Sequence, residues 1–328
     1  MSPSGCCSLH DAIVAEKLTK YYGDFLAVDH ISFRVRRGEI YGFLGPNGAG
    51  KTTTVRMLCG LTRISEGKAY IYGYDINREL VAIKKLIGVV QDISNLYMEL
   101  SCYDNLMFCA EMYGVPRNKR KERVMDLLRF FGLEDRKHVK FKELSKGLKR
   151  SLAIAAALVH EPKLLFLDEP TIGLDVKSKR QIWNFIRKLN EEGITIFLTT
   201  HNIYEAFRLC NRIAIINRGK IIAEGTPTEL RKKVSGNKII ELQVSPPIKK
   251  SAIFDSVDGI IDVKIGHDNT ICITIDDTIA ALEGILRMVK KLNLEIIMLS
   301  LRGADAEDVF IKLIDKTEKN IGFSTGDD

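Results

Sequence analysis

A glycine-rich loop, GPNGAGKT at positions 45–52, holds the first residues whose types and spacing suggest chemistry. It fits the pattern GxxxxGK followed by Ser or Thr, and it lies between an apolar strand-like stretch and a helix-like one. Glycines let backbone N–H groups turn toward phosphates, and the amino end of a helix adds positive potential. We therefore expect Lys51 to reach the β- and γ-phosphates of a nucleotide and Thr52 to offer its hydroxyl to Mg²⁺.

Two further stretches carry residues suited to phosphate hydrolysis. LLFLDE (164–169) is an apolar strand that ends in two carboxylates, and FLTTH (197–201) is a strand that ends in a histidine. Asp168 is expected to hold Mg²⁺ through water, and Glu169 to polarise the attacking water. His201 is expected to contact the γ-phosphate. Acidic residues at strand ends and single histidines are common in proteins. The catalytic interpretation of these residues therefore depends on the phosphate loop in the same chain.

The surrounding sequence predicts the elements that position these residues. Apolar and polar residues alternate as in strands at 13–23, 27–39 and 68–76, whereas 101–160 has mainly helical spacing. From 163 to 219, strand-like and helix-like stretches alternate. This order predicts an α/β fold, a phosphate-loop core with a largely parallel sheet and an inserted helical block.

A polar break, KKVSGN (232–237), predicts a domain boundary. Beyond it, strand-like runs and two helix-like stretches, 280–292 and 304–314, predict a small α+β domain. Net charge also changes there, because residues 1–237 carry +12 and 238–328 carry −5, which add to the chain's +7. The predicted division is a tail at 1–10, an ATP-binding cassette at 11–234 with a helical subdomain near 92–160, an accessory domain at 238–317 and a tail at 318–328.

Composition places limits on the type of protein. The chain has 328 residues, 45% of them apolar and 28% charged, as in ordinary globular proteins. Its 7 cysteines form no CxxC pair, which favours reduced thiols in a cytoplasmic compartment. The N-terminal stretch lacks the features of a signal peptide. The apolar run LAIAAALV (152–159) is far shorter than a membrane span, so we expect no transmembrane segment.

With these motifs in this order, residues 11–232 resemble the ATP-binding subunit of an ABC transporter. The resemblance implies that Tyr22 stacks on adenine, with Tyr21 as a nearby competitor, and that Gln91 contacts Mg²⁺ and senses the membrane partner. It implies that Asp175 links the two sites of a dimer. It also assigns the whole phosphate loop to nucleotide binding: Gly45, Pro46, Asn47, Gly48, Ala49, Gly50, Lys51, Thr52 and Thr53.

The resemblance aligns LSKGL (144–148) with the family signature LSGGQ. In the family, the signature serine and second glycine contact the γ-phosphate of ATP held by the opposite subunit, which implies this role for Ser145 and Gly147. Lys146 replaces the first glycine and Leu148 replaces the glutamine. A lysine beside phosphate charge is electrostatically harmless. We therefore expect an active ATPase.

The resemblance implies ATP and Mg²⁺ as cofactors, a membrane-spanning transporter subunit as partner, and a second copy or a paralogous cassette to complete the dimer. The variant signature and AEDVFIKLID (306–315) are similar to a branch that often exports drugs, ions or lipids, which favours export. A peripheral position on the cytoplasmic face of the cell membrane follows from the resemblance. The residues around Gln91 to Tyr113 would carry the docking surface, and NLYMEL (95–100) either forms part of it or packs internally.

Two alternatives stay open at this level. A soluble ABC ATPase of translation or DNA repair is favoured only by the basic stretch RNKRKER (117–123), which lacks interleaved aromatic residues, so no nucleic-acid partner is expected. A regulatory protein that binds but does not hydrolyse nucleotide conflicts with Glu169 and His201. A GTPase would require NKxD, which the sequence lacks.

Overall fold

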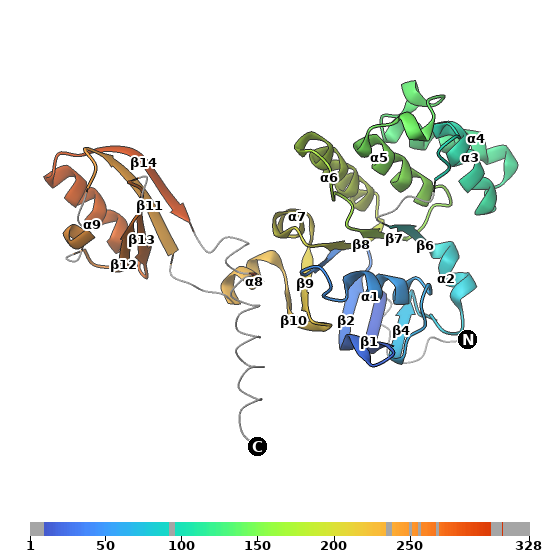
Figure 1. Cartoon of the computed structure of the whole chain (residues 1–328), viewed down its shortest axis with the longest axis horizontal. Coiled ribbons are helices and arrows are strands. Elements are labelled where there is room, and N and C mark those ends of the chain that lie inside the picture. Colours follow the sequence, from blue (N-terminus) through green and yellow to red (C-terminus); the bar gives the residue numbers. More distant parts are fainter. Residues whose placement is uncertain are drawn as a thin grey trace, which may run out of the picture. The chain divides into compact units, whose positions relative to one another are not determined.

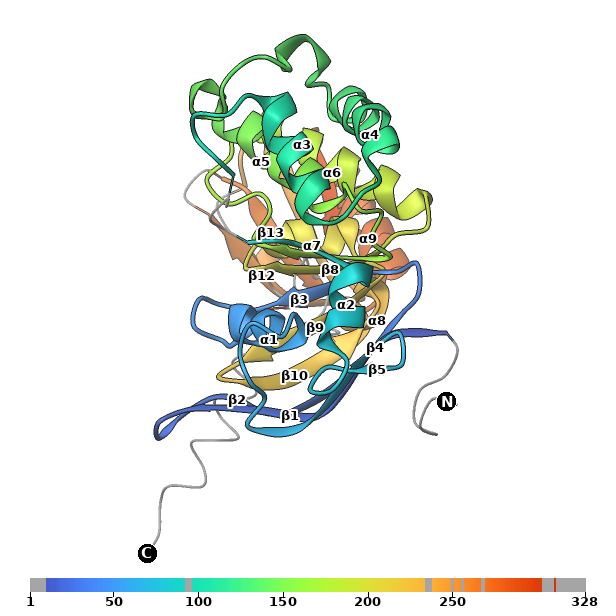
Figure 2. The ribbon, with the colours of Figure 1, turned by 90° about the vertical axis from the view of Figure 1, so that its right-hand side faces the viewer.

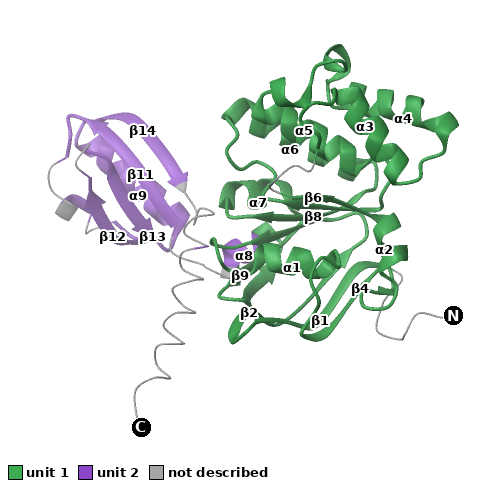
Figure 3. Ribbon diagram, turned by 45° about the vertical axis from the view of Figure 1, so that its right-hand side comes forward, with its two compact units in different colours: residues 1–227 green, residues 228–328 purple. Residues whose placement is uncertain are grey.

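The structure is a computed structural model that describes residues 10–91, 96–233, 238–248, 251–254, 257–266 and 269–302, together with Phe310. The chain forms two compact units, residues 1–227 and 228–328 (Figure 3). The division falls a few residues before the predicted break at 232–237. That the two units divide the work as cassette and accessory domain stays a prediction.

An antiparallel sheet holds the N-terminal strands of the first unit. Its order is β2 (Phe25–Arg36), β1 (Asp11–Tyr22), β4 (Glu66–Ile71) and β5 (Tyr74–Asp75). The alternation seen in the sequence corresponds to one buried face, most clearly along β2. Buried apolar residues of these strands, among them Ile13, Phe33 and Ile71, join the apolar core of the first unit.

A six-stranded sheet forms the centre of the first unit (Figures 1 and 2). Its order is β10 (Lys220–Gly225), β9 (Arg212–Asn217), β3 (Ile40–Leu44), β8 (Thr195–Thr200), β7 (Leu164–Asp168) and β6 (Ile87–Val90). Only the β9–β10 pair is antiparallel. Because parallel strands end at the same edge, the residues after β3, β7 and β8 come together there.

Helices cover both faces of this sheet (Figure 2). Between the two sheets lies α1 (Lys51–Leu58), whose Val55, Met57 and Leu58 pack into the core. The opposite side carries α3 (Cys102–Met112), α4 (Arg117–Phe130), α5 (Lys146–Ala157) and α6 (Val176–Glu191). Two shorter helices are α2 (Leu80–Leu86) and α7 (Ile203–Leu209). The sequence had not indicated α2, β6 or β10.

The second unit contains a four-stranded antiparallel sheet in the order β12 (Ile260–Ile265), β13 (Ile271–Ile275), β11 (Lys238–Ser245) and β14 (Glu295–Arg302). One face of this sheet packs against α9 (Thr278–Lys291) in a separate apolar core. The unit also includes most of α8 (Pro227–Lys233). The predicted helix at 304–314 lies outside the described residues except for Phe310. In the described part of the chain, no helix has both the length and the apolar character needed to cross a bilayer.

Candidate functional site

The phosphate loop runs from the end of β3 into α1, as its sequence predicts. Three of its glycines are fixed by geometry. A Cβ on Gly45 would lie 2.3 Å from the backbone oxygen of Ile216, while Gly48 and Gly50 have φ values of +80° and +104°. Side chains are strained in that backbone region. The loop therefore presents backbone amides where bulkier residues would not fit.

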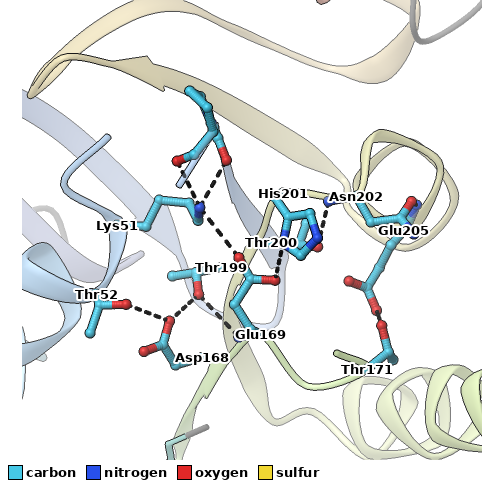
Figure 4. Close-up of polar contacts among 12 residues, drawn as sticks. Lys51, Thr52, Asp168, Glu169, Thr171, Thr199, Thr200, His201, Asn202 and Glu205 are labelled. Carbon is cyan, nitrogen blue, oxygen red and sulfur yellow. Dashed lines mark hydrogen bonds and ion pairs between the residues drawn. The ribbon is translucent and has the colours of Figure 1, made fainter. Parts of the chain in front are cut away.

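Lys51 is buried at the base of the loop and forms three polar contacts. Its Nζ donates hydrogen bonds to the carbonyl oxygens of Gly45, at 2.8 Å, and Pro46, at 3.1 Å. The same atom lies 3.3 Å from Glu169 Oε1. Figure 4 shows the Lys51 amine and the Glu169 carboxylate pointing toward each other. The phosphate loop and the end of β7 thus meet through one ion pair.

Asp168 is also buried, and two hydroxyls surround it. Thr52 Oγ1 donates to Asp168 Oδ1 at 3.3 Å, and the Thr199 hydroxyl donates to the same oxygen. Thr199 Oγ1 additionally accepts from the Glu169 backbone N–H at 3.2 Å. Thr199 was not among the residues predicted from the sequence, although it lies in the FLTTH motif two residues before His201.

Glu169 has an unusual backbone and a partly unsatisfied side chain. Its φ is +48°, a left-handed conformation that is costly for a residue with a side chain and is often found at functional sites. His201 Nδ1 lies 2.8 Å from Glu169 Oε2. Glu169 Oε1 is buried and accepts no hydrogen bond from the residues that the structure describes, although Lys51 lies close to it. One carboxylate oxygen can therefore still accept a hydrogen bond from a water or ligand.

Arg150 is a further residue that sequence reasoning missed. It lies on α5, is buried, and donates from Nη1 to the Gln91 carbonyl at 2.7 Å and from Nη2 to the Glu169 carbonyl at 3.2 Å. Its guanidinium joins the strand ends that carry Gln91 and Glu169 to the helix that follows the signature. A lone arginine on a helix gives no sequence signal for such contacts.

The predicted signature residues lie at the amino end of α5, beside the start of α6. Ser145 caps α5 and is exposed, as is Lys146. A Cβ on Gly147 would lie 2.5 Å from Ser178 Oγ, so close packing within this chain already requires glycine there. Asp175 caps α6 by accepting from the Ser178 backbone N–H at 3.0 Å, and that hydrogen bond lowers the pKa of the Asp175 carboxyl. Ser145, Gly147 and Asp175 thus lie together, in a group separate from the contact between Lys51 and Glu169.

Tyr22 lies at the end of β1 with 46% of its surface exposed. The ammonium of Lys20 lies 5.1 Å from the centre of its ring. Tyr21 and Phe25 are exposed nearby at the same turn. An aromatic face is therefore available for stacking, and the assignment of Tyr22 to adenine stays a prediction.

The residues predicted to hold Mg²⁺ have suitable chemistry. Hard divalent cations prefer oxygen ligands, and Thr52 and Asp168 bring a hydroxyl and a carboxylate together. Glu169 follows Asp168 directly, so its Oε1, which lies 3.3 Å from Lys51 Nζ, is a further oxygen beside them. The donor set therefore fits a magnesium ion that retains several water ligands. Gln91, the third predicted ligand, is joined to this region through its backbone contact with Arg150.

Comparison with known proteins places this arrangement in a family. The family model described as ABC transporter matches residues 28–172. The linearmycin resistance ATP-binding protein LnrL of Bacillus subtilis (strain 168) is 42% identical over 231 residues, which cover 70% of this chain and 74% of that protein. The chain belongs to the ABC transporter family, as an ATP-binding subunit.

Other relatives match over most of their length. Nod factor export ATP-binding protein I of Paraburkholderia xenovorans (strain LB400) is 37% identical and covers 92% of this chain and 96% of its own. The daunorubicin/doxorubicin resistance ATP-binding protein DrrA of Streptomyces peucetius is 35% identical, with 92% of each chain covered.

Solved structures of ATP-binding cassettes share the fold of the first unit. The structure of cbiO1 from Clostridium perfringens, part of the ABC transporter complex cbiONQ, has a TM-score of 0.63 and 30% identity, covering 69% of this chain and 94% of that one. A dimeric post-hydrolysis cassette bound to ADP and Pi has a TM-score of 0.60 and 28% identity, covering 66% of this chain and 98% of that one.

As an ABC ATP-binding subunit, this chain binds nucleotide, hydrolyses ATP to drive transport, and works with a membrane subunit and a second cassette. The predictions of family, fold class, ATPase activity and these partners are confirmed. The soluble alternative in translation or DNA repair gains no support, because the relatives described here are transporter subunits.

Proposed function

We propose that Glu169 is the general base of Mg²⁺-dependent ATP hydrolysis, and that this hydrolysis drives export through a membrane subunit at the cytoplasmic face of the cell membrane. One observation carries the catalytic part. Glu169 lies between Lys51 and His201, at 3.3 and 2.8 Å, and its buried Oε1 accepts no hydrogen bond within the described part of the chain. A base that activates water needs such a free acceptor held in a fixed place.

The residues divide the catalytic work as follows. The amides of the phosphate loop and Lys51 hold the β- and γ-phosphates, and Tyr22 supports the adenine. Glu169 takes the proton of the attacking water, while His201 holds that carboxylate by donating from Nδ1. When bound, Mg²⁺ would neutralise charge on the phosphates through Thr52, Asp168 and Gln91. Catalysis of phosphoryl transfer rests mainly on positioning and charge stabilisation.

The second cassette completes each site. Ser145 and Lys146 are exposed at the amino end of α5, where an ATP held by the opposite subunit can approach. Ser145 and Gly147 would contact its γ-phosphate, and Asp175 would link the two sites. The positive end of the α5 dipole favours this contact with an anion. These roles come from the family resemblance, and the exposure of Ser145 and Lys146 supports them.

The membrane subunit would dock on a cleft of about 410 Å³ beside Gln91. Leu96, Tyr113, Leu61 and Lys84 are among the residues that line it. Tyr97 and Met98, from the NLYMEL stretch, are both about half exposed. Exposed apolar side chains around a cleft are typical of a protein contact. Gln91 lines the cleft, and Arg150 bonds the backbone carbonyls of both Gln91 and Glu169. Arg150 would therefore couple the docking cleft to the proposed catalytic residue.

Export is the favoured direction. Two of the relatives described above are named for drug resistance and one for Nod factor export. Two of them match 92% of this chain, beyond the first compact unit. The transported compound would be selected by the membrane subunit, since every residue to which we assign a role serves nucleotide binding, hydrolysis or docking.

The test is a pair of carboxylate replacements. Glu169→Gln keeps the size of the side chain and removes the base, so ATP should still bind while turnover falls by about 100-fold or more. Glu192→Gln alters an exposed carboxylate after the end of α6 and should leave turnover unchanged. Lys51→Ala should weaken nucleotide binding itself. Near wild-type hydrolysis by the Glu169→Gln protein would rule out this assignment.

A further inference from the structure

Glu205 on α7 is a buried carboxylate that none of the roles above uses. Only 1% of its surface is exposed. Its Oε1 accepts hydrogen bonds from Thr171 Oγ1 at 2.7 Å and from Trp183 Nε1 at 2.8 Å. Figure 4 shows the Glu205 side chain extending from α7 to Thr171. Charged groups are rarely buried unless they are well hydrogen-bonded, so these two donors hold the carboxylate in one place.

Each of the three residues lies close in sequence to a residue of the proposed site. Thr171 follows Glu169 by two positions. Trp183 lies on α6, the helix that Asp175 caps. Glu205 follows His201 by four positions, and Asn202 caps α7 by accepting from the Glu205 backbone N–H at 3.1 Å. One carboxylate thus connects the segment after β7, the helix after Asp175 and the helix after His201.

The indole of Trp183 is held from a second direction as well. The guanidinium carbon of Arg208, also on α7, lies 5.4 Å from the centre of its ring. An apolar side chain at position 205 would fill the same space without the cost of burying a charge. The hydrogen bonds of Glu205 to Thr171 and Trp183 are directional, unlike apolar packing. They therefore fix where α7 begins relative to β7 and α6.

We propose that Glu205 is a positioning residue for ATP hydrolysis. By holding Thr171 and Trp183, it fixes the position in which His201 meets Glu169. It also joins that pair to α6, the helix that Asp175 caps. This inference rests on the proposed role of Glu169. Small misplacements of a catalytic group reduce the rate strongly while affecting substrate binding less.

The experiment compares Glu205→Ala with Glu205→Gln in the full-length protein. The alanine variant removes both hydrogen bonds and should lower kcat by about tenfold or more, with KM for ATP within about twofold of the wild type. Glutamine keeps a carbonyl oxygen that accepts from both donors, so it should recover most of kcat. Trp183 is the only tryptophan. Its fluorescence emission should therefore shift in the alanine variant and report directly that the contact is lost.

Glu39 supplies the matched control. It is a buried carboxylate that precedes β3, at the other end of that strand from Gly45, and it accepts from the Arg36 backbone N–H and from Arg212. Glu39→Ala should lower the melting temperature and leave kcat of the folded protein unchanged. An equal loss of kcat in the two alanine variants would overturn the inference, because it would show a general effect of losing a buried carboxylate.

Two conservative replacements cover the case in which Glu205→Ala does not fold. Thr171→Val and Trp183→Phe each remove one donor and keep most of the packing, so each should lower kcat severalfold with little change in KM. Unchanged kcat in both would overturn the inference. If Glu169→Gln abolishes turnover while the Glu205 network variants keep it, only this inference fails. Full turnover in Glu169→Gln would overturn the proposed function and this inference together.

Discussion

His201 Nδ1 lies 2.8 Å from Glu169 Oε2, which joins the ends of the adjacent strands β8 and β7. An ionised carboxylate can only accept, so His201 donates from Nδ1 and keeps Nε2 for another partner. Lys51 approaches the other carboxylate oxygen at 3.3 Å. Both oxygens of the Glu169 carboxylate are therefore in contact with a neighbouring side chain.

Replacement of His201 tests this arrangement. His201→Ala removes the donor to Glu169 Oε2 and should lower kcat by about tenfold or more, because the carboxylate loses its fixed direction. Affinity for ATP should change little, since the phosphate loop is intact. His201→Gln retains a side-chain donor and should keep more activity than alanine. Steady-state kinetics and nucleotide titration measure the two effects, and a loss of binding equal to the loss of kcat would contradict the assignment.

The variant signature gives a second prediction. Lys146 is exposed and is the first residue of α5, so its side chain can vary without disturbing the core. Lys146→Gly restores the commoner family residue and should change turnover by no more than about twofold to threefold, in part through the lower helix propensity of glycine. Ser145→Arg places a bulky cation at the cap and should stop turnover. Complete loss of ATPase activity in Lys146→Gly would show that this lysine is essential.

The second compact unit gives a third prediction. A chain that ends at Val234 keeps every predicted nucleotide-binding residue and should bind ATP with an affinity within about twofold of the full chain. Residues 238–328 carry −5 and the preceding residues +12, so we expect the second unit to support dimerisation by charge attraction. Light scattering should show less dimer after truncation, and this difference should shrink as salt rises. A folded truncated chain that fails to bind ATP would contradict the division of labour.

His160 gives a prediction about pH. Burial lowers the pKa of His160 below its usual 6.5. Its Nε2 contacts the Ile87 carbonyl at 2.9 Å, and its buried Nδ1 has no hydrogen-bond partner among the described residues. Below about pH 6.5 the unfolded chain therefore binds a proton that the folded chain resists. This contribution to stability is complete above the unfolded pKa and is lost as pH falls toward the folded one.

Melting curves at pH 7.5 and 5.5 measure the effect of His160. The melting temperature should fall between these values by more in the wild type than in His160→Gln, which cannot take up the proton. Glutamine can still donate to the Ile87 carbonyl. Because the wild type loses the His160 contribution as pH falls, the two proteins should be closest in stability at the lower pH. An identical fall in both proteins would show that His160 does not titrate in the proposed way.

The sequence was sufficient to predict a candidate site residue and its position in the fold wherever one short segment contains both the strand and that residue. The phosphate loop, the carboxylates Asp168 and Glu169 and the histidine His201 each lie at the end of an apolar strand. Parallel strands bring such ends to one edge of the sheet, so the meeting of Lys51, Glu169 and His201 could be expected. The elements α2, β6 and β10 were missed, whereas β3 and β7, which are shorter than β10, were found because each leads directly into a recognisable motif.

Contacts between distant segments could not be foreseen in the same way. Glu205, Trp183 and Arg150 are unremarkable residues on predicted helices, and their side chains act through partners that only folding brings near. Gly147 was expected to be glycine for a ligand in the opposite subunit, yet its close approach to Ser178 already requires it. The sequence by itself determined the family and the strand ends, and it predicted the residues proposed for the phosphate chemistry, because these depend on local spacing. Only the tertiary structure decided how those residues are held, because buried polar groups take whichever partners the packing of separate elements provides.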